Sequence, residues 1–270
     1  MKLSELAAAL AAAGIQDARG EARLLFAALG GYVPAALFGS DPVCDAPALS
    51  DALSRRLRRE PLQYILGEVG FCRETYRVTP DCLIPRPDTE LLVEEAIARL
   101  PRGAHFADLC TGSGCIAVST LAARTDCTAD AYDVEEAALV IAAENACRNG
   151  VSDRLSLLRR DLLREEIDGT YAAILANPPY IPDSVVDTLE PELSYEPRIA
   201  LAGGEDGMTF YRAILTLAPP HLLPSGFFLL EIGYDEEAAI TALAEEKHMT
   251  CRVLPDLGGN PRCAVLQMQD

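Results

Sequence analysis

From residue 83 to the end of the chain, short apolar stretches alternate with segments of helical periodicity. Short apolar runs bounded by turn residues are typical of buried strands. When strands alternate with helices, each helix returns the chain to the edge where the next strand begins, so the strands become parallel. The sequence therefore predicts a parallel α/β sheet, with strands at 106–109, 127–132, 155–158, 171–176, 227–232 and 263–268.

The first 72 residues follow a different pattern, in which alanines and leucines recur at helical spacing. Breaks at Gly14, Gly30, Gly39 and Pro42 divide this region into four or five short predicted helices. After this region, the stretch Glu74–Val78 alternates between polar and apolar residues, as the strands of a hairpin do. We therefore expect three segments, which are a helical domain (1–72), a hairpin linker (73–82) and the α/β domain (83–270).

One predicted strand, Tyr171–Ala176, is followed directly by Asn177-Pro178-Pro179-Tyr180. Two consecutive prolines fix φ and remove two backbone donors, so this loop is stiff and not helical. The Asn177 side-chain oxygen and the Pro178 carbonyl can accept hydrogen bonds from an –NH₂ group, while Tyr180 can pack against the plane of that group. The same residues also suit an ordinary turn after a strand, so the choice depends on what lies upstream.

A second informative segment begins at Phe106. A glycine-containing turn separates the predicted strand that ends near Leu109 from a predicted helix over 115–123. Gly112 and Gly114 allow a ligand to approach the backbone closely, and the helix start offers unpaired N–H groups. The next predicted strand ends at Asp133, whose carboxylate can accept hydrogen bonds from both hydroxyls of a ribose. These features predict a nucleoside-cofactor site at the carboxyl edge of the sheet.

Two cofactors compete for this site. The Gly-x-Gly-x-x-Ala pattern that begins at Gly112 satisfies the dinucleotide fingerprint, and Asp133 lies at a suitable distance along the chain. The same turn also contains Asp108 and Thr111, which give Asp-x-x-Thr-Gly-Ser-Gly, and this resembles motif I of S-adenosylmethionine (SAM)-dependent methyltransferases. A nicotinamide enzyme has no evident need for the Asn-Pro-Pro-Tyr loop, whereas a methyltransferase acting on an amide or exocyclic amine does. We therefore favour SAM over NAD.

The composition agrees with a cytoplasmic enzyme. Half of the 270 residues are hydrophobic, yet no apolar run approaches the roughly 20 residues that a membrane span needs. The N-terminus, Met-Lys-Leu-Ser-Glu, lacks the apolar core of a signal peptide. Nine cysteines without a Cys-x-x-Cys pair indicate reduced thiols, and three dispersed histidines suggest no metal site.

The net charge of −18 argues against binding to a nucleic-acid backbone and favours a basic protein partner. The exception is local, since Arg55-Arg56-Leu57-Arg58-Arg59 carries four arginines in five positions. Such a run forms either a solvated helix face or a contact to an acidic partner or RNA.

Longer blocks carry a family resemblance. The most specific are Leu83-Ile-Pro-Arg-Pro-Asp-Thr-Glu90 and the pair Tyr195-Glu-Pro-Arg-Ile-Ala-Leu201 and Gly203-Gly-Glu-Asp-Gly207. The remaining blocks are 59–67, 108–114, Asp133, 177–181, 230–233 and 256–262. Over nearly its full length the chain resembles the peptide-chain release factor glutamine methyltransferases, the PrmC/HemK family.

This resemblance implies a Rossmann-like class I SAM-dependent methyltransferase sheet, whose last two strands form an antiparallel edge, and a small N-terminal helical domain for substrate recognition. It also implies methylation of the glutamine side-chain amide in the Gly-Gly-Gln motif of peptide-chain release factors. SAM would be the methyl donor and S-adenosylhomocysteine the product. We expect a monomer that binds no membrane and makes no direct contact with nucleic acid.

The resemblance also implies roles for individual residues. Cofactor binding would involve Asp108, Cys110, Thr111, Gly112, Ser113, Gly114, Asp133, Asp161, Leu162 and Asn177. Substrate binding would involve Asn177, Pro178, Pro179 and Tyr180, and of these Asn177, Pro178 and Tyr180 would be catalytic. Two departures from the family pattern bear on cofactor affinity: Cys110 stands where glycine is usual, and Leu162 stands where a bulky aromatic residue often lies beside the adenine.

Two rival functions stay open at this point. A DNA or RNA amino-group methyltransferase of the adenine type shares the Asn-Pro-Pro-Tyr loop, and a SAM-binding regulator without catalysis shares the cofactor site. Three charged residues also have open roles. Arg86 and Glu90 fit either an interdomain ion pair or a substrate-side role, while Glu231 could cap a loop or face the cleft.

Overall fold

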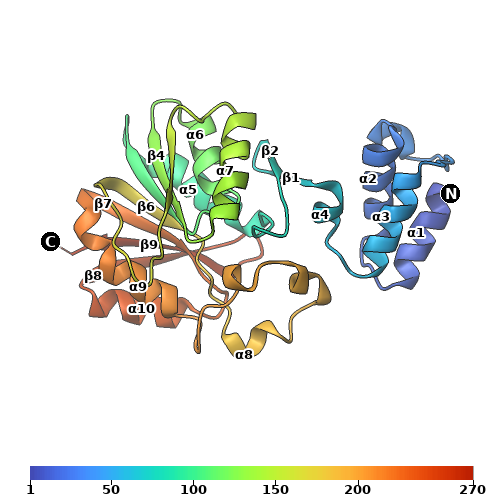
Figure 1. The fold of residues 1–270 in the computed structure, drawn as a ribbon. Coiled ribbons are helices and arrows are strands. Elements are labelled where there is room, and N and C mark those ends of the chain that lie inside the picture. Colours follow the sequence, from blue (N-terminus) through green and yellow to red (C-terminus); the bar gives the residue numbers. More distant parts are fainter. Residues whose placement is uncertain (270) are drawn as a thin grey trace. The chain divides into compact units, whose positions relative to one another are not determined.

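A computed structural model describes residues 1–269, and the chain divides into two compact units. The helical unit comprises Met1–Glu68 together with the short segment Glu190–Tyr195. The α/β unit comprises the remaining described residues from Val69 onward, and Figure 1 draws the fold of both units. Each unit is described by itself below.

The helical unit contains four α-helices and a 3₁₀ turn before residue 68. Their bounds are α1 (Leu3–Ala12), α2 (Ala18–Gly30), η1 (Pro34–Leu37), α3 (Pro47–Leu57) and α4 (Leu62–Leu66). Helix α2 begins at a side-chain cap, since Asp17 accepts a hydrogen bond from the Gly20 N–H at 3.0 Å, and it ends at left-handed Gly31. Leu6, Leu10, Leu25 and Phe26 are buried in a shared core, as their helical spacing predicts.

The second unit is built on a seven-stranded sheet with the order β5-β4-β3-β6-β7-β9-β8. The strands are β3 (His105–Leu109), β4 (Thr128–Asp133), β5 (Leu155–Arg159), β6 (Tyr171–Ala176), β7 (Leu222–Glu231), β8 (Met249–Pro255) and β9 (Pro261–Met268). The five strands from β5 to β7 pair in parallel, and β9 pairs antiparallel with both β7 and β8. The predicted parallel α/β sheet is therefore confirmed.

The antiparallel edge of the sheet differs from the prediction in one strand. The expected pair, β7 and β9, does form, but the outermost strand is β8, which the sequence analysis missed. The sequence of β8 alternates, with Met249 buried, Thr250 exposed and Arg252 exposed. The polar residues Thr250 and Arg252 suit an edge strand with one solvent-exposed face. They also weaken the apolar pattern by which the other strands were recognised.

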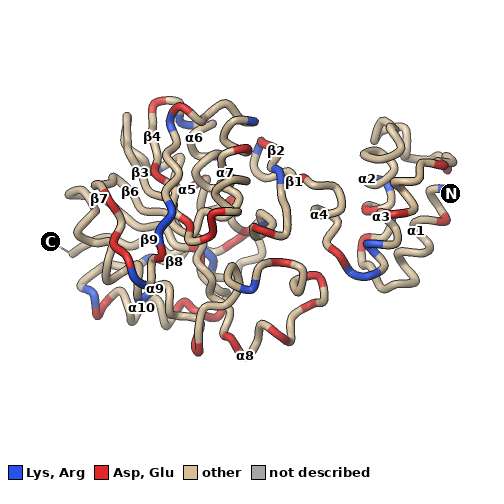
Figure 2. Tube along the Cα trace, viewed as in Figure 1, with Lys and Arg blue, Asp and Glu red and all other residues tan. Residues whose placement is uncertain are grey.

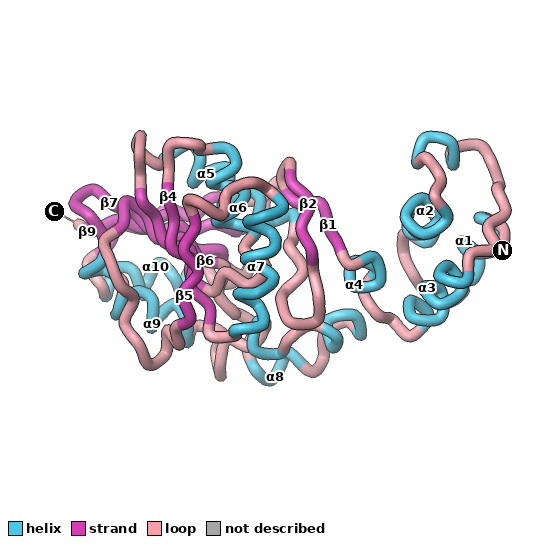
Figure 3. Tube along the Cα trace, turned by 45° about the horizontal axis from the view of Figure 1, so that its top comes forward, coloured by secondary structure: helices cyan, strands magenta, loops and turns pink. Residues whose placement is uncertain are grey.

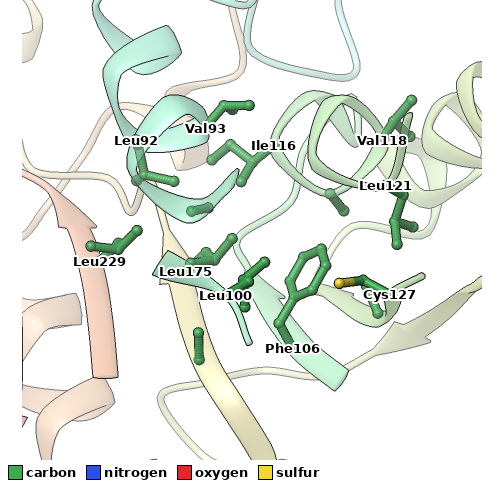
Figure 4. Close-up of a cluster of buried hydrophobic side chains, with 14 of the residues drawn as sticks. Leu92, Val93, Leu100, Phe106, Ile116, Val118, Leu121, Cys127, Leu175 and Leu229 are labelled. Atoms are coloured by element: carbon green, nitrogen blue, oxygen red, sulfur yellow. The ribbon is translucent and has the colours of Figure 1, made fainter. Parts of the chain in front are cut away.

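Helices cover both faces of this sheet. Alternate strand residues point to opposite faces, so Phe106, Leu175 and Leu229 lie in one cluster (Figure 4), while Ile174 and Phe228 lie in the other. The first cluster is covered by α5 (Glu90–Arg99), α6 (Cys115–Ala123) and α7 (Glu136–Arg148), and the second by α9 (Thr209–Leu217) and α10 (Glu237–Glu246). Figure 3 shows the strands between the helices.

The remaining elements are short. A separate two-stranded sheet is formed by β1 (Glu68–Phe71) and β2 (Glu74–Arg77), drawn apart from the main sheet in Figure 3. The other short helices are η2 (Pro87–Thr89), α8 (Asp183–Val186), η3 (Pro191–Tyr195), η4 (Arg198–Ala200) and η5 (Pro219–His221). Among the described residues, no helix is long and apolar enough to cross a membrane.

The strand order locates the site. From β3 the chain continues to β4 and β5 on one side of the sheet, whereas from β6 it continues to β7 on the other side. In an open parallel sheet, ligands bind at the carboxyl ends of the two strands between which this reversal occurs. The loops that follow β3 and β6 are therefore brought side by side at the edge where ligands bind.

Candidate active site

The loop after β3, residues 110–114, is called the cofactor loop below. Three of its residues have left-handed backbone conformations: Cys110 (φ 58°), Gly112 (φ 55°) and Gly114 (φ 81°). The loop is closed by backbone hydrogen bonds from the Thr111 N–H to the Tyr132 carbonyl (2.9 Å) and from the Gly114 N–H to the Thr111 carbonyl (2.8 Å). A left-handed φ costs a non-glycine residue roughly 1–2 kcal/mol, which explains physically why glycine is usual at the position of Cys110.

Behind the cofactor loop lies Asp108, which is fully buried. Its Oδ2 accepts hydrogen bonds from the Thr111 hydroxyl (2.6 Å) and from the Ala117 N–H at the start of α6 (3.2 Å). Its Oδ1 is buried without a hydrogen-bond partner among the described residues. Burial raises the pKa of Asp108 to about 7, although the two hydrogen bonds oppose this. Asp108 therefore joins the loop to the helix and fixes the shape of the turn.

At the end of β4, Asp133 connects the cofactor loop to the next turn. Its Oδ2 accepts from the Gly112 N–H at 2.8 Å and its Oδ1 accepts from the Glu135 N–H at 3.0 Å. Burial raises the pKa of Asp133, and the backbone hydrogen bonds from Glu135 and Gly112 lower it. An ionised carboxylate has about four acceptor positions, so each Asp133 oxygen retains room for a further donor.

The loop after β6, residues 177–180, is called the amide loop below. Asn177 directs its Nδ2 to the Thr89 hydroxyl oxygen at 3.1 Å, and its Oδ1 accepts no hydrogen bond from the described residues. Asn177 and Pro179 line the same cavity as the cofactor loop. An uncommitted carboxamide oxygen thus lies beside the cofactor loop.

The backbone of the glycine-rich block at 203–207 packs against the backbone of the amide loop. Ile181 donates its N–H to the Leu201 carbonyl at 3.0 Å and accepts from the Gly203 N–H at 2.8 Å. A Cβ atom on Gly203 would lie 2.7 Å from the Cα of Tyr180 and 2.8 Å from the Pro179 carbonyl oxygen. Only glycine therefore allows this backbone to pack so closely against the amide loop.

The hydroxyl of Tyr180 donates to Oε1 of Glu231 at 3.3 Å. Glu231, the last residue of β7, is 2% exposed, and its Oε2 has no hydrogen-bond partner among the described residues. Burial raises the pKa of Glu231 to about 7, while a hydrogen bond with Thr89 and the positive charge of Arg262 lower it. The question that the sequence left open for Glu231 is thereby answered, since it lies behind the amide loop.

The two loops share a cavity of about 590 Å³. This volume lies within the usual range of about 300–1,000 Å³ for cofactor and small-molecule sites. The predicted site residues that line it are Cys110, Gly112, Asp133, Asp161, Leu162, Asn177 and Pro179. Backbone N–H groups, carboxylates and apolar walls in one cavity fit a cofactor that combines an amino acid, a ribose and an adenine.

The other predicted site residues do not line the cavity. These are Asp108, which bonds the cofactor loop through Thr111, and the loop residues Thr111, Ser113, Gly114, Pro178 and Tyr180. The lining also includes residues that the sequence analysis did not assign, among them Leu83, Glu135, Asp183, Arg198, Thr209 and Phe210. Leu83 and Arg198 belong to the two most specific sequence blocks, so the blocks themselves were the available signal.

Arg86 and Glu90 have partners in their own unit. Arg86 pairs with Glu196, whose other oxygen accepts from the Ile84 N–H at 3.0 Å. Glu90 accepts a hydrogen bond from the Cys72 N–H at 2.7 Å, at the turn of the hairpin. Among the described residues, Arg86 and Glu90 thus each bond a residue of the same unit.

The arginine run in the helical unit is largely neutralised by its own acidic neighbours, and its blue segment follows α3 in Figure 2. Arg55 pairs with Glu60, and buried Arg56 bonds both Glu21 (2.7 Å) and Glu192 (3.0 Å). Arg59 also pairs with Glu192, at 2.8 Å. These internal ion pairs account for the charge of Arg56 without a solvated helix face or an external acidic partner.

All nine cysteines are free thiols, and burial raises the pKa of both Cys110 and Cys115. In the part of the chain that the structure describes, no three His, Cys, Asp or Glu residues are grouped so that they could hold a metal ion.

Comparisons with known proteins identify the family. The family described as the methyltransferase small domain matches residues 87–190, and the PrmC N-terminal domain matches residues 2–67. A release factor glutamine methyltransferase from Cereibacter sphaeroides is 43% identical over 262 residues, which cover 94% of this chain and 92% of that protein. One from Moorella thermoacetica is 38% identical over 269 residues, with 97% and 95% covered.

The fold is also found in a crystal structure of a methyltransferase from Pyrococcus furiosus, with 20% identity, a TM-score of 0.54 and coverage of 71% of this chain and 86% of that one. The predicted fold class and family are thus confirmed, and with them the enzyme class, a SAM-dependent protein glutamine methyltransferase. The chain belongs to the release factor glutamine methyltransferase family.

Proposed function

We propose that this enzyme transfers a methyl group from SAM to the side-chain amide nitrogen of the glutamine in the Gly-Gly-Gln motif of peptide-chain release factors. One observation carries the proposal within the site. The Asn177 carboxamide bonds Thr89 through its nitrogen, which leaves its oxygen uncommitted in a cavity shared with the cofactor loop. Such an oxygen can accept a hydrogen bond from a substrate amide N–H.

The cofactor would be held by the loops at the ends of β3 and β4. The cofactor loop, with Asp108 behind it, would bind the methionine part, and Asp133 would accept hydrogen bonds from the ribose hydroxyls. Asp161 and Leu162 line the cavity where the adenine would bind, so the contact from Leu162 would be aliphatic. Bound SAM would supply an activated methyl group on a sulfonium.

The protein must then make a poor nucleophile react, because the lone pair of an amide nitrogen is delocalised into its carbonyl. The Asn177 oxygen and the Pro178 carbonyl would accept hydrogen bonds from the two N–H groups and aim the nitrogen at the methyl carbon. Positive charge grows on the nitrogen during transfer, so these acceptors stabilise the transition state more than the ground state. Holding the reacting atoms roughly 3–3.5 Å apart supplies much of the remaining acceleration.

The reaction balances without a general base supplied by the protein. An N–C bond forms, the S–C bond breaks, and one proton leaves the nitrogen for water. The products are the N5-methylglutamine side chain and S-adenosylhomocysteine. We also propose that the enzyme acts as a monomer in the cytoplasm, where release factors function, and size-exclusion chromatography with light scattering would test the monomer.

The amide loop would suit an adenine amino group equally well, since that group presents the same –NH₂ geometry. The net charge of −18 disfavours a nucleic-acid substrate. The relatives named above are release factor enzymes, which also supports the protein substrate.

Methyl transfer from labelled SAM tests the proposal. The assay offers the enzyme a purified bacterial release factor, the same factor with Gln→Ala in its Gly-Gly-Gln loop, and duplex DNA. We expect label on the unmodified factor alone. Label on DNA, or on no substrate despite measurable SAM binding, would overturn the proposal in favour of a nucleic-acid enzyme or a non-catalytic SAM-binding protein.

A further inference from the structure

Three sequence blocks meet behind the amide loop. Thr89 ends η2 in the block at 83–90, Glu231 ends β7 in the block at 230–233, and Arg262 belongs to β9 in the block at 256–262. Thr89 is 1% exposed and Glu231 is 2% exposed. These residues come from three separate segments of the chain, and it is the fold that brings them together.

The hydrogen bonds between these groups have a defined direction. A threonine hydroxyl has one proton to donate and can accept through its oxygen. The Thr89 oxygen accepts from Asn177 Nδ2 at 3.1 Å, so its own proton remains available. The Thr89 hydroxyl also lowers the pKa of the Glu231 carboxyl, as a donor does that faces an ionised carboxylate, which can only accept. The proton of Thr89 is therefore directed to Glu231.

This direction selects one orientation of the Asn177 carboxamide. If the carboxamide were flipped, its oxygen would meet the oxygen of Thr89, whose proton faces Glu231. Two acceptors would then face each other, and the –NH₂ group would face the cavity. A substrate amide needs an acceptor there, so the flipped orientation would be inactive.

We propose that Glu231 and Thr89 are positioning residues that act through Asn177: Glu231 fixes the proton of Thr89, and Thr89 in turn fixes the carboxamide with its oxygen towards the substrate amide. This inference rests on the function proposed above and deepens it. Glu231 accepts a further hydrogen bond from Tyr180, so the same carboxylate also holds the last residue of the amide loop.

The unused acceptor capacity of Glu231 supports this role. Its Oε2 is buried and has no hydrogen-bond partner among the described residues, which is costly for a purely structural side chain. Arg262 provides the compensating positive charge, and it is itself held by Asp88 (3.3 Å) and Asp256 (3.4 Å). A buried carboxylate with an unsatisfied oxygen is a local cost of the kind expected at a functional site.

The first test removes the hydroxyl of Thr89 without changing its shape. Thr89→Val leaves the nitrogen of Asn177 without an acceptor, so we expect kcat on the release factor to fall about tenfold, with the SAM dissociation constant within about twofold of the wild-type value. Thr89→Ser restores the hydroxyl and should recover most of kcat.

The matched control is Thr120→Val. Thr120 lies on α6 and is also fully buried, but its hydroxyl has no hydrogen-bond partner among the described residues. This variant should keep the wild-type kcat. A Thr89→Val enzyme with wild-type kcat, or one that loses SAM affinity as much as turnover, would overturn the inference. Wild-type enzyme that modifies no release factor would instead overturn the proposed function, so the two failures are distinguishable.

The second test is the pH profile of kcat at saturating SAM. A protonated Glu231 could donate to Thr89 and reverse the direction of the hydrogen bonds, so activity should be present above the pKa of Glu231 and lost as the pH falls through it. Burial raises this pKa to about 7. The ionisable groups that act on Glu231 or feel its charge are Asp88, Tyr180, Arg262, Cys115, Cys263 and Tyr211.

Glu231→Gln keeps a carboxamide oxygen that can accept from Thr89 but cannot titrate. Its kcat should therefore no longer fall as the pH decreases through about 7. Asp108, whose pKa is also raised to about 7, acts on the cofactor loop, so its titration should affect SAM affinity and not kcat at saturation. A Glu231→Gln enzyme with the same acidic limb in kcat as the wild type would contradict the role of Glu231.

Discussion

The cofactor loop and the amide loop follow neighbouring parallel strands, and each is backed by one buried carboxyl group with one unpartnered oxygen. Asp108, behind the cofactor loop, accepts from Thr111 and from the backbone of Ala117, both less than ten residues away along the chain. Glu231, behind the amide loop, accepts from Tyr180, which lies 51 positions away, and interacts with Thr89 in a third segment. The carboxyl group behind the cofactor loop thus bonds residues nearby in the sequence, whereas the one behind the amide loop bonds a residue far away in the sequence.

This difference separates two properties of the enzyme. The shape of the cofactor loop should govern how tightly SAM binds, because its support acts on backbone groups that meet the cofactor. The orientation of the amide loop should govern turnover, because its support acts on an acceptor for the substrate amide. Substitutions behind the two loops should therefore change different constants.

The largest expected effect comes from Asn177→Ala. Removal of the carboxamide oxygen removes an interaction that strengthens in the transition state, so turnover should fall by about 10²-fold or more, equivalent to about 2.7 kcal/mol. Calorimetric titration should show SAM affinity close to that of the wild type. If SAM affinity fell as far as turnover did, Asn177 would not have the amide-holding role.

Asp108→Ala should give the opposite pattern. The Thr111 hydroxyl and the Ala117 N–H lose their shared acceptor, so the free energy of unfolding should decrease by about 1–3 kcal/mol. The distorted loop should bind SAM at least about tenfold more weakly, while kcat at saturating SAM changes less. Unchanged SAM affinity in a folded variant would contradict the proposed support of the loop by Asp108.

The helical unit provides a region that depends on neither loop. Arg56 is buried between Glu21 and Glu192, so Arg56→Ala leaves Glu21 without its ion-pair partner and Glu192 with Arg59 alone, and it should destabilise the helical unit by about 1–3 kcal/mol in denaturant unfolding. Exposed Arg58 is the matched control, and Arg58→Ala should stay within about 0.5 kcal/mol of the wild type. Equal losses in the two variants would rule out a special structural role for Arg56.

Cys110→Gly should produce the smallest effect, and it should be stabilising. Cys110 has a left-handed backbone (φ 58°), which glycine adopts without steric cost. The relief of roughly 1–2 kcal/mol is partly offset by the larger entropy of unfolded glycine, so the net gain should be about 1 kcal/mol or less in the free energy of unfolding. A loss of stability would show that the Cys110 side chain packs more favourably than its backbone suggests.

The contrast between local and tertiary support also explains what the sequence could predict. Helix α6 and strand β6 have the predicted bounds, Cys115–Ala123 and Tyr171–Ala176, because a continuous apolar pattern and adjacent turn residues define both. The cofactor loop was recognised for the same reason. Its glycines, its acid and its helix start lie within one short segment.

Features that depend on distant segments were missed or left open. Thr89 and Glu231 lie in recognisable blocks, but no local pattern shows that the first meets Asn177 and the second meets Tyr180. Arg56 likewise looked like part of a charged run, and its partner Glu192 lies 136 residues away. Strand β8 was missed because its alternating polar residues weaken the apolar signal.

A double-mutant cycle between Thr89→Val and Asn177→Ala, measured as kcat on the release factor at saturating SAM, tests the central claim most directly. If Thr89 acts by orienting Asn177, its substitution should cost about tenfold in the wild-type background and less than about twofold once Asn177 is already alanine. Equal costs in both backgrounds would show that Thr89 contributes independently of Asn177, and this would contradict the account of the amide loop.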